Sequence, residues 1–291
     1  MHTMNRRMFF MRGAAASALL TATRYLSANP LGLPIGCQTY PVRKSISTDF
    51  AGTMKGLRAA GFTQIELCSP YGYDEFSSLQ KYKPQELRRM LNDWGLGCIS
   101  AHWAPNELFQ KAEESIAYAK EFGMTQMAIA ALGPFNSKTT QTVDDVRRYV
   151  DPFNTFAEKA HSAGIVALLH NEGFVSKHID GKPVYDMMIA ELNPATTKLQ
   201  FQVSTMQEGY DPVTYFKKYS GRYLSMHCQD WVKDSTTKSG FRQVPLGKGV
   251  VDWQAVFTAA KPAGVKNYFV ELEEDPTLMP PSVPYLRSLK V

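Results

Sequence analysis

Short apolar runs that end in polar residues recur along this chain, and each is followed by a helix-like segment. Four of them are Ile165–Glu172, Leu199–Thr205, Tyr223–Trp231 and Asn267–Glu273. A strand buried in a parallel sheet reads as such a run, because helices cover both of its faces. The polar residues that end each run would lie at the mouth of the sheet. If these strands share one barrel, their polar ends converge on a single site.

The same alternation extends over the whole chain from residue 33 onward. We predict eight strands, at 33–40, 64–68, 97–103, 124–132, 165–172, 199–205, 223–231 and 267–273. Helices are predicted at 50–60, 84–94, 107–122, 143–162, 184–192, 211–221 and 252–263, with a short final helix at 284–289. Eight strand–helix units predict an α/β fold that closes into a single (β/α)8 TIM barrel.

The competing architecture is an open, doubly wound sheet, which usually carries a glycine-rich phosphate turn after its first strand. The turn from Gln38 to Ser45 reads QTYPVRKS and contains no glycine. No internal linker rich in Gly, Pro or Ser divides the chain, so we expect one barrel domain over residues 29–291. The segment between the seventh strand and Gly249 is expected to form a long loop. At the other end of the chain, Ser47 or Thr48 is expected to cap the helix at 50–60.

The first 28 residues differ in character from the rest. They contain four arginines and no acidic residue, so the remainder keeps only +1 of the formal charge of +5. The pair Arg6-Arg7, followed by Phe9 and an apolar run at 13–22, resembles a twin-arginine (Tat) export signal. The run is too short for a membrane span, so no stable membrane anchor is expected. We therefore predict an exported, periplasmic protein with a signal over residues 1–28.

Charge and cysteine spacing exclude several classes of protein. A nearly neutral body argues against nucleic acid as a partner. The four cysteines are Cys37, Cys68, Cys98 and Cys228, and none forms a CxxC pair. A zinc ribbon or thioredoxin-like motif is therefore not supported. We interpret the cysteines as small core residues.

In a TIM barrel, functional side chains lie at the carboxyl ends of the strands. The candidates at those positions are Gln38, Tyr40, Glu66, His102, His170, Glu172, Gln202, His227, Asp230, Glu271 and Glu273. Because side chains alternate along a strand, His170 and Glu172 point the same way. Glu271 and Glu273 also share a face, although we expect only one to reach the centre.

The second half of the chain carries the most specific motifs. They read LLHNEGF, LQFQVST, DPVTYFKKYSGRYLSMHCQD, VPLGKGVVDW and AGVKNYFVELEED. In this order they resemble the xylose isomerase-like TIM-barrel superfamily of sugar-phosphate isomerases and epimerases. The resemblance extends over residues 33–291. Its most specific part is the seventh strand followed by Gly247-Lys248-Gly249, Val251-Asp252-Trp253 and then Glu271.

The resemblance implies one divalent metal, Mn²⁺, Zn²⁺, Co²⁺ or Mg²⁺, held by His170, Gln202, His227 and Glu271. The chain departs from the family at two of these strands. Gln202 stands where the family usually has aspartate, and Gln229 stands where a lysine often follows the histidine of the seventh strand. The set therefore has one less negative charge than the family norm. Glu172 could restore an anionic ligand.

The expected activity is proton abstraction next to the carbonyl of a sugar or oxidised (keto) sugar, with the metal polarising the oxygen. Glu172, His102 and Glu271 are the candidate catalytic residues. The substrate-binding candidates are Gln38, Glu66, Trp103, Asp230 and Lys248. Isomerisation, epimerisation and β-elimination on a 3-keto sugar share one intermediate. Isomerisation or epimerisation is the leading prediction, and a lyase or hydratase that acts by β-elimination is the alternative. Export disfavours a phosphorylated substrate.

Other interpretations stay open from the residues alone. Gln202 could simply hydrogen-bond neighbouring strands, and Glu66 could be a buried salt-bridge partner. Trp103 could pack at the barrel rim. A non-catalytic sugar-binding barrel is supported by the missing aspartate at Gln202. An abasic-site endonuclease of the same superfamily is disfavoured by the near-neutral body. The oligomeric state and the particular sugar stay open.

Overall fold

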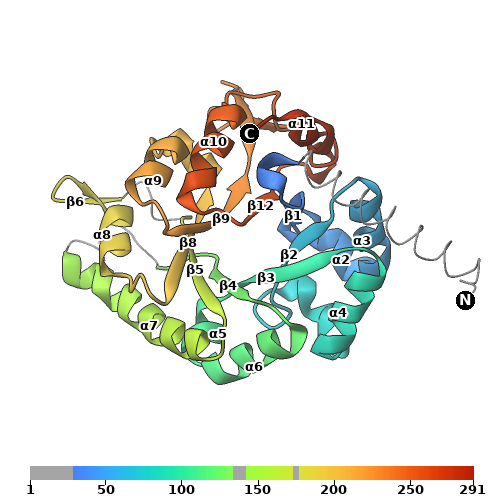
Figure 1. The fold of residues 1–291 in the computed structure, drawn as a ribbon, viewed down its shortest axis with the longest axis horizontal. Helices are drawn as coiled ribbons and strands as arrows, with labels where there is room; N and C mark the ends of the chain where they lie inside the picture. Colours follow the sequence, from blue (N-terminus) through green and yellow to red (C-terminus); the bar gives the residue numbers. More distant parts are fainter. Residues whose placement is uncertain (1–28, 134–141, 173–176) are drawn as a thin grey trace, which may run out of the picture.

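The computed structural model describes residues 29–133, 142–172 and 177–291. Eight parallel strands close into a barrel in the order β1-β12-β9-β8-β5-β4-β3-β2, and the helices lie outside this ring (Figure 1). The barrel strands are β1 (Gly36–Gln38), β2 (Gln64–Cys68), β3 (Gly97–Trp103), β4 (Gln126–Ile129), β5 (Val166–His170), β8 (Thr197–Gln202), β9 (Tyr223–Cys228) and β12 (Asn267–Val270). The predicted single (β/α)8 barrel is confirmed.

Ten α-helices and five short 3₁₀ helices lie in the described part of the chain. The α-helices are α2 (Arg43–Thr48), α3 (Phe50–Ala59), α4 (Pro84–Asp93), α5 (Pro105–Phe109), α6 (Ala112–Phe122), α7 (Val143–Ser162), α8 (Val184–Glu191), α9 (Pro212–Lys218), α10 (Trp253–Ala263) and α11 (Ser282–Ser288). The 3₁₀ helices are η1 (Pro30–Gly32), η2 (Tyr40–Val42), η3 (Asp74–Lys81), η4 (Val203–Glu208) and η5 (Pro276–Leu278). None of the described helices is long and apolar enough to cross a membrane.

Several predicted boundaries are wrong for local reasons. The first strand stops at Gln38, because the chain turns into η2, which contains Pro41, and then into α2. The cap of α3 is Asp49, whose side chain accepts a hydrogen bond from the Gly52 N–H, rather than Ser47 or Thr48. The helix predicted at 107–122 is two helices, α5 and α6.

The predicted long loop after the seventh strand is also wrong. The barrel strand β9 ends at Cys228, and the chain then forms an antiparallel hairpin of β10 (Asp230–Lys233) and β11 (Phe241–Val244). A second small hairpin pairs β6 (His178–Ile179) with β7 (Lys182–Pro183). The predicted export signal at residues 1–28 lies outside the described residues.

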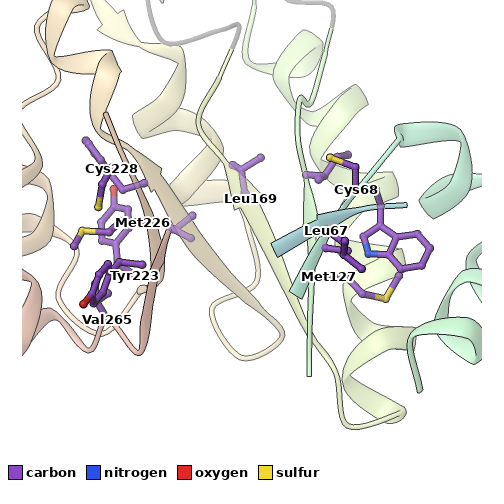
Figure 2. Close-up of a cluster of buried hydrophobic side chains, with 14 of the residues drawn as sticks. Leu67, Cys68, Met127, Leu169, Tyr223, Met226, Cys228 and Val265 are labelled. Atoms are coloured by element: carbon purple, nitrogen blue, oxygen red, sulfur yellow. The ribbon is translucent and has the colours of Figure 1, made fainter. Parts of the chain in front are cut away.

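The layer between the strands and the helices is apolar. Figure 2 shows Leu67, Met127, Leu169 and Met226, from β2, β4, β5 and β9, within a cluster of buried hydrophobic side chains. Each alternates with an inward-pointing neighbour on its strand. Cys37, Cys68 and Cys228 are also buried in the core, and all four cysteines are free thiols.

The interior of the barrel, by contrast, is filled with hydrogen-bonded polar side chains. Gln200 Nε2 donates to Glu66 Oε1 at 2.9 Å and to Ser225 Oγ at 3.1 Å. Asn267 Nδ2 donates to the same Ser225 oxygen at 2.9 Å and to Gln126 Oε1 at 3.1 Å. These five residues come from five strands and are buried. The interiors of such barrels are more often filled by branched apolar residues.

Candidate active site

Three buried histidines meet at the centre of the barrel. His102, His170 and His227 point inward from β3, β5 and β9, and their ring centroids are 4.6–5.0 Å apart. One nitrogen from each ring lies within 4.8 Å of the others, which is close enough to hold one metal ion. The sequence interpretation placed His170 and His227 among the ligands and His102 among the catalytic candidates. The structure brings all three together.

His227 lies between two carboxylates. Its Nε2 is 2.6 Å from Glu66 Oε2, and its Nδ1 is 3.0 Å from Glu271 Oε2. Burial alone would lower the pKa of His227, but these two carboxylates raise it to about 10. Burial would likewise raise the pKa of Glu66, but His102 and His227 hold it well below its usual value. Glu66 therefore forms buried ion pairs, as the salt-bridge interpretation expected, and lies directly against the histidine cluster.

The amide of Gln202 is fixed by Glu271. Gln202 Nε2 donates to Glu271 Oε2 at 2.7 Å, and Gln229 Nε2 donates to the same oxygen at 3.1 Å. A donor must face this carboxylate, so the Gln202 carbonyl oxygen points elsewhere. That oxygen, Oε1, is buried and has no hydrogen-bond partner among the described residues. Gln202 is the register partner of His227 across β8 and β9, so the unpaired oxygen belongs to a residue beside a cluster histidine.

His170 is the least constrained member of the cluster. Neither of its ring nitrogens has a hydrogen-bond partner among the described residues, although Nε2 is 3.6 Å from Glu172 Oε2. Burial lowers the pKa of His170, which favours the neutral imidazole that binds metals. Unpaired buried polar atoms are rare in proteins, and those of His170 and Gln202 lie in the residues predicted as ligands. The donor set therefore fits a divalent metal.

A cavity of about 240 Å³ reaches the histidine cluster at His102. It is lined by Tyr40, Cys68, Tyr73, His102, Ala130, Glu172, Glu271 and Glu273. Both Glu271 and Glu273 line it; Glu271 is buried, whereas Glu273 is partly exposed. Desolvation and the neighbouring Glu271 raise the pKa of Glu273 to about 8. Desolvation would also raise the pKa of Glu172, but His170 lowers it below its usual value.

Other predicted substrate-binding residues lie away from this cavity. Trp103 follows His102 on β3 and points outward, where its ring packs edge-on against Tyr118 with centroids 6.0 Å apart. Lys248 lies on an exposed turn. Gln38 is buried and is not a lining residue, but it contacts two that are: its side-chain carbonyl oxygen accepts a hydrogen bond from the Tyr40 N–H, and its Nε2 lies 3.4 Å from Cys68 Sγ.

Asp230 organises the loop after the hairpin. Its Oδ2 accepts hydrogen bonds from Gly247 N at 2.9 Å, Gly249 N at 3.2 Å and Trp253 Nε1 at 3.0 Å. Its Oδ1 accepts from Val251 N at 3.2 Å. The carboxylate is fully buried. Asp230 therefore holds the Gly247-Lys248-Gly249 loop in place, and the amides of both glycines are already used.

We expect Asp230→Ala to lower the free energy of unfolding by about 3 kcal/mol or more, because several buried donors lose a charged acceptor at once. The matched control is Lys248→Ala, on the exposed turn that Asp230 holds. It should change the free energy of unfolding by less than about 0.5 kcal/mol. Denaturant unfolding of both variants measures the difference. Equal stability of the two would show that Asp230 does not hold the loop.

Sequence reasoning missed three residues of the site. Gln200 lies two residues before Gln202 on β8, and its Oε1 is 2.8 Å from His102 Nε2. The same alternation that selected Gln202 could have found it. Tyr73 and Ala130 lie beyond the ends of β2 and β4, in loops where no periodicity operates. Tyr73 packs against Tyr40, with ring centroids 6.2 Å apart.

A closed (β/α)8 barrel with three histidines and several carboxylates at its strand ends defines a class of TIM-barrel protein with a polar, metal-compatible centre. Comparison with known protein families identifies the family within this class. The profile of the Xylose isomerase-like TIM barrel family matches residues 55–289, and the chain belongs to this family. No curated protein matches the chain.

Solved structures share the fold at low sequence identity. A sugar phosphate isomerase/epimerase from Parabacteroides distasonis is 22% identical, with a TM-score of 0.71 over 87% of this chain and 93% of that one. An L-ribulose 3-epimerase is 17% identical, with a TM-score of 0.62 over 89% and 87%. The IOLI protein, solved with a bound zinc atom, is 14% identical, with a TM-score of 0.63 over 88% and 95%.

Proposed function

We propose that the protein is an exported enzyme that isomerises or epimerises an unphosphorylated sugar or keto sugar by moving a proton at the carbon next to its carbonyl group. One observation carries this proposal. Glu172 and Glu273 line the same cavity beside the histidine cluster, and the strands that they follow, β5 and β12, are separated in the barrel by β8 and β9. Two carboxyl groups thus approach a bound sugar from different sides, which suits removal and return of a proton.

Three side chains would hold a divalent metal in this site, His102, His170 and His227, and His227 would release its proton on binding. The free carbonyl oxygen of Gln202 and the carboxylate of Glu271 complete the donors implied by the family resemblance. Imidazole ligands suit Zn²⁺, Co²⁺ and Mn²⁺ better than Mg²⁺. When bound, such an ion would polarise the carbonyl oxygen of the substrate.

The remaining groups have distinct roles in the proposal. Glu172 takes the proton, since it is half-exposed at the cavity and its lowered pKa keeps it deprotonated and able to accept one. Glu271 is tied to His227 and to the amides of Gln202 and Gln229, so it positions these groups rather than acting as a free base. The rings of Tyr40 and Tyr73 supply an aromatic wall against which a sugar ring can pack.

Charge in the site supports an unphosphorylated substrate. Three carboxyl groups line the cavity, of which Glu172 and Glu271 are carboxylates, and no lysine or arginine is among its described lining residues. The Gly247-Lys248-Gly249 loop does not offer its glycine amides to a phosphate, because Asp230 accepts both of them. Like charges repel strongly in a buried site, so a phosphate dianion would be poorly accommodated.

The direct test is a screen of neutral aldoses, ketoses and keto sugars in D₂O, followed by NMR. The proposal expects deuterium at the carbon next to the carbonyl and formation of an isomer or epimer. An unsaturated product would identify the lyase alternative instead. Sugar binding with no deuterium exchange in any substrate would favour a sugar-binding barrel without catalysis.

The proposal of export has its own test. Replacing Arg6 and Arg7 together with lysine should leave the protein in the cytoplasm, because the twin-arginine system recognises paired guanidinium groups that lysine does not reproduce. Cell fractionation with antibody detection measures the distribution. A matched variant, Arg24→Lys, lies outside the motif and should be exported normally. Unchanged export of the double variant would contradict a twin-arginine signal.

A further inference from the structure

A second cavity lies outside the barrel, beside the ends of β2 and β3. Its volume is about 270 Å³, close to the lower end of the range for small-molecule sites. It is lined by Tyr71, Trp103, Asn106, Glu107, Lys111, Glu114, Ser115 and Tyr118. Those residues come from the end of β3, helices α5 and α6, and the loop after β2 (Figure 1).

The floor of this outer cavity is polar and buried. Trp103 is 1% exposed, Glu107 3% and Ser115 6%. Glu107 is held in place by the Ala104 N–H, which donates to Oε2 at 2.9 Å, and by the Ser69 hydroxyl, which donates to Oε1. The indole N–H of Trp103 is buried and has no hydrogen-bond partner among the described residues. An unpaired buried donor is costly, which makes it a feature that a ligand can exploit.

Aromatic rings form the wall. Tyr118 packs edge-on against Trp103 on one side and against Tyr71 on the other, where the ring centroids are 5.7 Å apart. Tyr71 is 58% exposed and makes up part of the rim. The exposed part of the Tyr71 ring is therefore available to a ligand in the cavity.

We propose that this outer cavity binds one neutral sugar ring. The exposed charges at its rim, Lys111 and Glu114, are opposite in sign, so no strongly charged ligand is favoured. Trp103, whose indole N–H is an unpaired donor, lines the cavity together with the acceptor groups of Glu107 and Ser115, and a polyhydroxylated ring can match both kinds of group. Apolar faces of such a ring can lie against Tyr71 and Tyr118. The choice of ligand class rests on the proposed function.

The outer cavity is a close neighbour of the catalytic one. Tyr71 and Trp103 line the outer cavity. Tyr73 and His102, which are close to them in the chain, line the cavity beside the histidine cluster. Between them, Gly72 packs so tightly on Glu107 that a Cβ atom would overlap its carboxylate.

The test reads binding at Trp103 without any turnover. Protein labelled with 5-fluorotryptophan contains four tryptophans, and Trp103→Phe assigns the signal of interest. Maltose and methyl α-glucoside are titrated into the wild type and followed by ¹⁹F NMR. We expect a saturable shift of the Trp103 signal and none at Trp253, which is buried and bonded to Asp230. Tyr71→Ala should raise the dissociation constant about five- to tenfold, while Tyr71→Phe should stay within twofold.

Two results would overturn the proposal: no saturable response of Trp103 to either saccharide, or equal affinity in Tyr71→Ala and the wild type. Its failure is distinguishable from failure of the catalytic proposal. Deuterium exchange without a Trp103 response removes the outer site only. A Trp103 response without deuterium exchange retains the outer site and removes only the catalytic function.

Discussion

Turnover should fall about 10²–10⁴-fold when Glu172 is replaced by glutamine, because the amide keeps the shape of the side chain but cannot accept a proton. The side chain is 54% exposed, and its polar contact among the described residues is the 3.6 Å approach to His170 Nε2, so the fold should be unaffected. The measurement is the rate of deuterium exchange and product formation on the best substrate from the screen.

The matched control for this variant is Glu158→Gln, on the exposed face of α7. It makes the same chemical change far from the cavity and should leave turnover unchanged. Metal content is measured for both proteins, so that a loss of metal is not mistaken for the loss of a base. Full turnover by Glu172→Gln with normal metal content would show that another group removes the proton.

Replacing His170 with leucine should weaken metal binding by more than about a hundredfold, since even residues that only support ligands contribute 10–100-fold. This histidine is the cleanest probe of the cluster because neither ring nitrogen has a hydrogen-bond partner in the described part of the chain. His227→Leu would be less informative, because it also removes an ion-pair partner from two buried carboxylates, Glu66 and Glu271.

Calorimetric titration of Zn²⁺, Mn²⁺ and Co²⁺ into chelator-treated protein measures this effect, with elemental analysis of the untreated protein beside it. His161→Leu, at an exposed position of α7, is the control and should bind as the wild type does. If the wild type takes up none of these ions, or if His170→Leu binds them with undiminished affinity, the histidine cluster is not a metal centre.

The architecture was predictable from sequence because periodicity determines which face of an element a side chain occupies. The strands β2 and β3 and the helix α7 have the predicted bounds. Periodicity does not predict which side chains an inward-pointing group will contact. His102 joins His170 and His227 because the barrel closes, bringing β3 near strands more than 60 residues later in the chain.

Gln202 and Asp230 show what could not be predicted from the sequence. The orientation of the Gln202 amide is set by Glu271, which lies 69 residues away and whose position is fixed only by the complete barrel. Asp230 was predicted at the end of a strand, facing a substrate. The strand breaks at Gln229 instead, so Asp230 begins a hairpin and turns toward the backbone of a later loop. The glycine at 240, with a φ of +77°, and the serines and threonines before it were signals of that hairpin turn.

The hydrogen-bonded interior of the barrel has a consequence for how such a protein can change over evolutionary time. In an apolar interior, one branched residue can replace another with a modest loss. Here Gln200, Ser225 and Asn267 each hydrogen-bond to more than one neighbour. A change at any of them therefore leaves donors or acceptors on other β-strands without a partner. Single substitutions on the way to a new interior would be disfavoured, and compensating changes would have to arise together. New activities in this lineage are therefore expected to come from the loops above the strands, while the polar interior persists as one inherited unit.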